Sequence, residues 1–172
     1  MALTDADVIS SSFRRPEAFE VVFQRHFAGV FRYLRRRAGP IAEDLAAETF
    51  TRAFAGRGGY DLDRSDARPW LFGIATNVLR AHLRDAYIPA FPPEREDTLV
   101  DVDDRLDAAS TLARHAIALR ALPVEQREVL LLIAVAELTY EETAEALGIP
   151  VGTVRSRMSR ARATLAPVNQ ES

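Results

Sequence analysis

Residues 139–165 constrain the fold more than any other part of the sequence, because they predict two helices joined by a tight turn: TYEETAEALGIPVGTVRSRMSRARATL. Thr139 is a good N-cap, and Glu142 completes a capping box three residues later. Gly148 can adopt the backbone conformation that ends a helix. Pro150 suits the start of the next helix, because the N–H that it lacks would have no partner in the first turn.

The second of these helices has one apolar and one basic face. Apolar residues recur at spacings of four, three and four, which places them on one side of a helix: Val154, Met158, Ala161 and Leu165. The opposite side is polar and carries no acid: Thr153, Arg155, Ser156, Ser159, Arg160 and Arg162. Such a pair is typical of the helix-turn-helix motif, in which Arg and Ser can bind bases or phosphates. The alternative is a solvated basic face on an ordinary helix pair.

No part of the sequence has the pattern of a catalytic or metal site. The chain has no Cys, which excludes a disulfide framework, a thiol nucleophile and a Cys-based zinc site. Its histidines lie far apart, with no second ligand at metal spacing, and each is expected to be structural: His26, His82 and His115. No clustered acid–base pair, phosphate loop or nucleophile elbow is present. We therefore predict a protein that is not an enzyme and that uses no metal or cofactor.

Length and hydropathy predict a folded protein that does not enter a membrane. The 172 residues allow one or two small domains, and 48% hydrophobic with 27% charged residues is an ordinary composition. No stretch reaches the length of a membrane span, and the first residues lack a basic-then-apolar signal pattern. A cytoplasmic location is expected.

The first half of the chain predicts three helices. Apolar residues recur at helical spacing over 13–37, 41–54 and 70–84, and Gly39-Pro40 separates the first two. Residues 1–12 are polar and are expected to be frayed. Residues 56–69 are rich in Gly, Asp and Arg, and a loop of this length favours a binding loop over a plain connector.

Two surfaces of these helices have a distinct charge. The outer face of 41–54 is acidic and includes Asp44 and Glu48, so it is either a plain soluble surface or a docking face for a partner protein. The outer face of 70–84 is polar and basic, and it forms a second candidate nucleic-acid surface: Gly73, Thr76, Asn77, Arg80 and Arg84.

An acidic, Pro-containing segment divides the chain. From 88 to 107 there are seven acids against two arginines, a net charge of −5, and three prolines precede all of these charged residues. We interpret 88–109 as a linker between two small helical domains, 13–87 and 110–168, of an all-α protein. The second domain opens with a helix over 110–122 and a buried apolar helix over 124–138. The linker is either a passive spacer or, because of its sign, an electrostatic cover for the basic faces.

Four motifs in this order resemble the extracytoplasmic-function group of bacterial sigma factors. AEDLAAETFTRAF at 42–54 is similar to the polymerase-binding helix of that family, and WLFGIATNVLRAHLR at 70–84 is similar to its promoter-melting helix. ALPVEQREVLLL at 121–132 and the stretch 139–165 resemble its C-terminal DNA-binding domain. One departure is the pair Ala46-Ala47, where the family often has Val-Gln.

The resemblance implies a subunit that binds core RNA polymerase and directs promoter-specific initiation, with an anti-sigma factor as a further partner. It implies that Arg155, Ser156, Ser159, Arg160 and the neighbouring Thr153 read the minus-thirty-five element of promoter DNA. It further implies that Asn77 and the 58–69 loop capture an unstacked minus-ten base beside Arg80 and Arg84, and that Asp44 and Glu48 face the polymerase.

A stand-alone helix-turn-helix repressor or activator remains the alternative. A net charge of −3 speaks against it, because nothing in the overall charge would offset repulsion from DNA phosphates.

Overall fold

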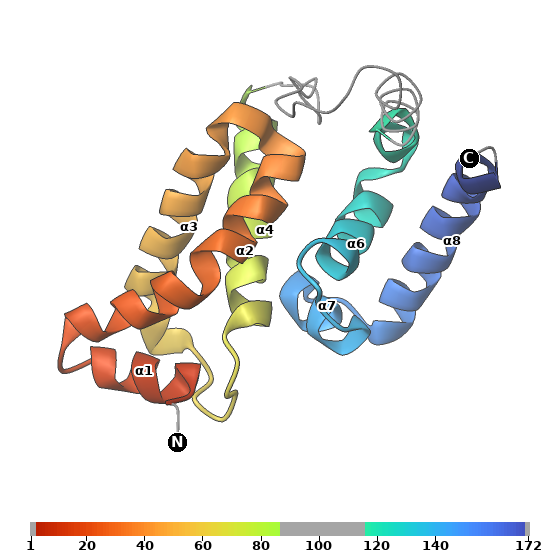
Figure 1. Ribbon diagram of the computed structural model, residues 1–172. Coiled ribbons are helices and arrows are strands. Elements are labelled where there is room, and N and C mark those ends of the chain that lie inside the picture. The colour runs from red at the N-terminus through yellow and green to blue at the C-terminus, as the bar shows by residue number, and fades with distance from the viewer. Residues whose placement is uncertain (1–2, 87–115, 171–172) are drawn as a thin grey trace, which may run out of the picture.

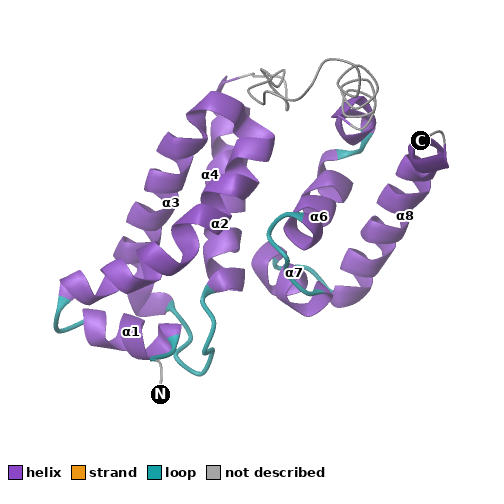
Figure 2. Cartoon of the chain, viewed as in Figure 1, coloured by secondary structure: helices purple, strands orange, loops and turns teal. Residues whose placement is uncertain are grey.

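The computed structural model describes residues 3–86 and 116–170, and within these two ranges the chain forms only helices and loops (Figure 2). The predicted all-α fold is confirmed. We call residues 3–86 the first lobe and residues 116–170 the second lobe. The acidic linker and the beginning of the helix expected over 110–122 lie outside the described residues.

Four α-helices build the first lobe, with short 3-10 turns between them (Figure 1): α1 Asp5–Ser12, α2 Glu20–Ala38, α3 Ala42–Gly56 and α4 Arg68–Ala86. The helices α2, α3 and α4 pack against one another. Their buried residues follow helical spacing, for example Val30, Tyr33 and Leu34 of α2 and Leu71, Ala75 and Val78 of α4. Burying one such aliphatic side chain contributes about 1.5–3 kcal/mol.

The expectation that residues 1–12 are frayed is wrong for residues 4–12. Thr4 accepts a hydrogen bond from the Asp7 N–H and the Asp7 carboxylate accepts one from the Thr4 N–H, so a capping box starts α1. Val8 and Ile9 are buried in the first lobe. Two buried apolar residues and a good cap are enough to order this helix, although most of its residues are polar.

The second lobe contains the three helices α6 Val124–Ala134, α7 Tyr140–Leu147 and α8 Val151–Gln170, and residues 116–121 are helical before them. Arg127 of α6 is buried and ties the lobe to that preceding turn. Its guanidinium donates to the carbonyl oxygens of Leu119, Arg120 and Leu122 at 2.9, 2.6 and 2.8 Å.

The predicted helix-turn-helix is confirmed in its local details. The capping box is present, with hydrogen bonds of 3.1 Å from the Glu142 N–H to the Thr139 hydroxyl and 2.6 Å from the Thr139 N–H to the Glu142 carboxylate. Gly148 ends α7 in the left-handed conformation, with φ at 64°. Val154, Met158 and Ala161 are buried as expected.

The apolar run 124–138 is not one helix. The helix α6 ends at Ala134, and the chain then turns so that Glu137 has a φ of 56°. Ala136 and Leu138 remain buried in this turn, which explains why the run is apolar beyond the helix. In the described ranges, every helix is too short or too polar to cross a membrane.

Candidate nucleic-acid interface

The basic face of α8 is available to a ligand. Arg155, Ser156, Ser159 and Arg160 are exposed, while Thr153 is half-buried. Arg155 lies 3.7 Å from the Glu141 carboxylate, and both side chains are about two-thirds exposed. An exposed pair of this kind contributes little, so a DNA phosphate or base can displace Glu141. The face therefore presents donors at the spacing that the sequence predicts.

The polar face of α4 differs from the continuous basic stripe that was predicted. Asn77 and Arg84 are exposed, as expected. Thr76 is buried, however, and its hydroxyl lies 3.0 Å from that of Tyr33. Gly73 is also buried, because the backbone of Ala146 in α7 lies against it. The face therefore exposes polar side chains at Asn77 and Arg84. Nearer the start of the helix, at Gly73 and Thr76, other parts of the protein cover it.

Arg80 is held by an acid of the second lobe. Its Nε donates to Glu128 Oε1 at 2.9 Å and its Nη2 donates to Glu128 Oε2. These hydrogen bonds raise the pKa of the Arg80 guanidinium above its ordinary value. Glu128 is fully buried, and the fully buried Arg37 approaches its Oε1 at 3.5 Å. Sequence patterning does not predict this pair, since Glu128 lies within an apolar run.

The loop before α4 is fixed from two sides. The ring of Tyr60 packs at a tilt against that of Trp70, with ring centroids 5.0 Å apart, and its hydroxyl donates to the Arg64 carbonyl at 2.5 Å. Burial, followed by the nearby negative charges of Asp5 and other acids, raises the pKa of Tyr60 to about 12. Tyr60 therefore stays a neutral donor at physiological pH.

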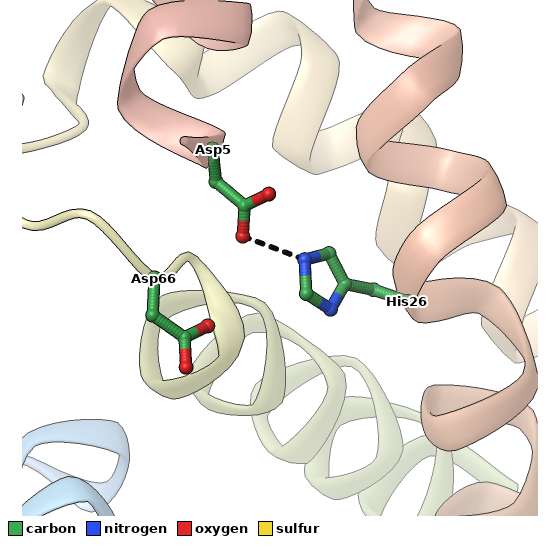
Figure 3. Close-up of side chains that lie close together, drawn as sticks. All are labelled: Asp5, His26 and Asp66. Atoms are coloured by element: carbon green, nitrogen blue, oxygen red, sulfur yellow. Dashed lines mark hydrogen bonds and ion pairs between the residues drawn. The ribbon is translucent and has the colours of Figure 1, made fainter. Parts of the chain in front are cut away.

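The second anchor of this loop is the carboxylate of Asp5 in α1 (Figure 3). It accepts hydrogen bonds from Arg25 at 2.8 Å and from the Ala67 N–H at 3.0 Å. It also pairs with His26 Nε2 at 2.7 Å. Burial opposes the ionisation of Asp5, but its hydrogen bonds to His26, Ala67 and Arg25 outweigh burial and hold its pKa well below the ordinary value.

Asp66 brings a third potential metal ligand to this cluster, within 4.8 Å of Asp5 and His26. A cation there would have to displace Arg25 and His26 from the Asp5 carboxylate. The geometry therefore fits a hydrogen-bonded tie between α1, α2 and the loop better than a metal centre. Sequence spacing missed the cluster, because its members are more than 20 positions apart in sequence.

The outer face of α3 is acidic, and a partly exposed aromatic side chain lies on the neighbouring helix α2. Asp44, Ala47 and Glu48 are exposed, as predicted, and Glu48 pairs with Arg52 one turn later. Phe50 of the same helix contacts Phe23 of α2, with ring centroids 5.0 Å apart, and Phe23 is 39% exposed. An exposed aromatic group is typical of a protein-binding surface.

Two family models match most of the described chain: Sigma-70 region 2 at residues 22–87 and Sigma-70, region 4 at residues 118–165. RNA polymerase sigma factor HrpL of Pseudomonas syringae pv. syringae is 38% identical over 108 residues, which cover 59% of this chain and 59% of HrpL. The match therefore spans about three fifths of that relative.

The ECF RNA polymerase sigma factor SigC of Mycobacterium tuberculosis is 37% identical over 128 residues, which cover 72% of this chain and 68% of SigC. Among solved structures, that of CnrH in complex with the cytosolic domain of CnrY matches with a TM-score of 0.72 and 27% identity. This match covers 98% of both chains.

Proposed function

The chain belongs to the extracytoplasmic-function group of sigma-70 RNA polymerase sigma factors, and on this premise we propose that its two lobes divide promoter recognition between them. The first lobe binds core polymerase and opens the minus-ten element, and the second lobe reads the minus-thirty-five element. Residues 13–87 and 110–168 are the proposed domains, with 88–109 as the linker. The ordered α1 adds residues 5–12 to the first of them.

The exposed basic face of α8 carries the proposal for the second lobe. Arg155 and Arg160 are free to enter a major groove, where a guanidinium can bind guanine in two places at once. Ser156 donates its hydroxyl hydrogen to the Thr153 carbonyl at 3.0 Å, so its oxygen is left to accept from a base amine. Ser159 is exposed one turn further along.

Asn77 and the loop before α4 support the proposal for the first lobe. Asn77 is exposed on α4, and an amide can pair with the edge of an unstacked base. The loop is anchored by Tyr60 and Asp5, so its polar groups are already positioned when the base arrives. Arg80 and Arg84 follow on the same helix and would neutralise the adjacent phosphates.

Core polymerase would bind the outer face of α3. Asp44 and Glu48 supply charge, and the exposed edge of Phe23 beside Phe50 supplies apolar area. Ala47, where the family often carries Gln, removes one hydrogen-bonding side chain from this face. The phosphoryl-transfer chemistry would belong to the polymerase, so the chain itself needs no catalytic residue, and its place would be the cytoplasm with the polymerase.

A protein regulator is the remaining proposed partner. CnrH, which is similar over nearly the whole chain, was solved in complex with the cytosolic domain of CnrY. We expect an anti-sigma factor to bind this chain as well.

A gel shift with and without core polymerase tests the proposal. The protein alone should bind a specific promoter weakly, because its net charge is −3, and should bind it tightly once assembled with core enzyme. Tight, sequence-specific binding by the protein alone would instead establish the stand-alone repressor or activator.

A further inference from the structure

Gly152 lies in the first turn of α8, on the side of this helix that faces away from the rest of the second lobe. The helix packs against α6 and α7 with its opposite side (Figure 1). At about 100° per residue, Gly152 is roughly opposite Val154 and Ala161, and both of these residues are completely buried. The next residues on the same outward line are Ser156 and Ser159, which are exposed like Gly152 itself.

Nothing within the described protein requires a glycine at position 152. A Cβ atom added there would have no heavy atom within 4 Å, apart from its chain neighbours and its own helix backbone. Its φ also lies outside the positive range, whereas Gly148, which ends α7, has a φ of 64°. Glycine in a helix lowers stability relative to alanine. The glycine at position 152 therefore weakens α8 with no gain in packing or in turn geometry.

Long cationic side chains stand on both sides of this outward line. Measured around the helix from Gly152, Arg155 is turned by about 60° to one side and Arg160 by about 80° to the other. Both arginines are exposed. A helix of this shape is flat along its outermost line and tall at its flanks. It can therefore bring its backbone close to the floor of a groove while the guanidinium groups reach toward the sides.

We propose that Gly152 determines specificity for promoter DNA, because its missing side chain lets the start of α8 come close to the base edges of the minus-thirty-five element. This inference rests on the proposed function, which places α8 in the major groove. That groove is about 12 Å wide and a helix with its side chains is about 10–12 Å across, so the fit leaves little room. In helix-turn-helix proteins the first residues of the recognition helix contact base edges.

The reach of the neighbouring side chains makes this clearance important. A hydrogen bond from an N–H or O–H group keeps its strength over a range of only about half an ångström. Ser156 has a short side chain, so it can reach a base only if the helix backbone itself lies near the groove floor. Bulk at position 152 would hold Ser156 away from the bases first, and would then weaken the base contact of Arg155.

The proposal predicts that a single substitution has opposite effects on the fold and on DNA binding. Gly152→Ala adds a methyl group for which the free protein has room, so its Tm should rise by about 1–4 °C. In the holoenzyme, the same methyl group should weaken binding to the minus-thirty-five element. A variant that folds poorly cannot produce this combination.

Binding is measured for the holoenzyme on two duplexes. The first is the sequence that the wild-type holoenzyme enriches most from a library randomised over the minus-ten and minus-thirty-five elements, and the second is the same duplex with the minus-thirty-five element scrambled. We expect Gly152→Ala to raise Kd about fivefold or more on the first duplex and less than about twofold on the second. Gly152→Leu should raise Kd on the first duplex further, because a larger side chain holds the helix further out.

Gly29→Ala is the matched control. Gly29 lies in α2 of the first lobe, and its added Cβ atom would meet Phe72 at an ordinary distance of 3.8 Å. This variant makes the same chemical change inside a helix that has no proposed contact with DNA. Its Kd should equal that of the wild type on both duplexes.

The inference is overturned if Gly152→Ala raises Tm and leaves Kd on the first duplex unchanged, or if it raises Kd equally on both duplexes. Arg155→Ala and Arg160→Ala on the same two duplexes separate this result from the proposed function. A specific loss in these variants, without one in Gly152→Ala, overturns the inference alone. No specific loss in any of the three variants overturns the placement of α8 in the groove as well.

Discussion

The Asp5 carboxylate accepts a hydrogen bond from the Ala67 N–H at 3.0 Å, so the first helix of the chain fixes the last residues of the loop before α4. The Asp5 N–H in turn donates to the Ser65 carbonyl at 3.0 Å. A helix that the sequence pattern assigns to a frayed end therefore positions a loop that we assign to base capture.

Asp5→Asn should destabilise the first lobe and remove part of its acid sensitivity. The pKa of Asp5 is lower in the folded protein than in the unfolded chain, so its stabilisation is present above the unfolded pKa of about 3.9 and is lost as pH falls below that value. Loss of the charged hydrogen bonds should cost about 1.5–3 kcal/mol near pH 7. Thermal melts at pH 7 and pH 3 measure both effects, and Asp63→Asn, at an exposed position of the loop before α4, is the control. An equal loss at the two pH values would contradict a charged Asp5.

Glu137→Gly should stabilise the protein. Glu137 has a φ of 56°, and a left-handed conformation costs a residue with a Cβ about 1–2 kcal/mol. Glycine removes that strain and keeps the carbonyl that accepts from Arg68, so a net gain of about 0.5–1 kcal/mol is expected after the entropy of the unfolded chain is counted. Chemical denaturation measures it. Glu125→Gly, in the exposed first turn of α6, should destabilise instead, and a loss of stability in both variants would refute the strain argument.

Arg155→Ala or Arg160→Ala in the holoenzyme should each cost roughly 1–3 kcal/mol of binding at the minus-thirty-five element, if the guanidinium binds a base in two places. The measurement compares promoter DNA with DNA in which that element is scrambled. An equal loss on both DNAs would mean contact with phosphate only.

Val154→Asp should unfold the second lobe, because Val154 is completely buried.

Asn77→Ala should slow open-complex formation and change the base preference at one minus-ten position. Asn77 is exposed on α4, so removal of its amide should leave the fold intact. Permanganate footprinting of the holoenzyme on a set of promoters reads the unstacked bases directly. Normal melting on all of them would remove Asn77 from the site.

Asp44→Arg together with Glu48→Arg should weaken assembly with core polymerase and leave the fold intact, since both side chains are exposed on α3. Fluorescence anisotropy of labelled protein against core enzyme measures the affinity, and circular dichroism checks the fold. Unchanged affinity would mean that another face docks to the polymerase.

The sequence predicts the local features of the fold well and the long-range ones poorly. The capping box at Thr139 and the helix end at Gly148 depend on neighbours within a few residues, so their pattern is visible in the sequence. The contact between Asp5 and Ala67 joins residues 62 positions apart, and no periodicity points to it.

The polar face of α4 shows a second limit. Gly73 and Thr76 have the small, polar character of a solvent-facing stripe, but each is buried for a reason that lies elsewhere. Thr76 meets the Tyr33 hydroxyl, and Gly73 meets the α7 backbone. A small residue suits a close packing partner as well as it suits water, and hydrophobicity alone cannot tell the two apart.

The buried charges of Arg37 and Glu128 make the contact between the two lobes depend on temperature. The Nε and Nη2 atoms of Arg37 have no hydrogen-bond partner among the described residues, so its charge is balanced chiefly by Glu128 across the lobe boundary. The cost of removing charged groups from water falls on warming, because their hydration is entropically unfavourable. Heating therefore strengthens the contribution of this pair to the contact between the lobes, while the exposed pair of Arg64 and Glu145 adds little at any temperature. Warming therefore shifts the balance of charge contributions at the lobe boundary toward Arg37 and Glu128.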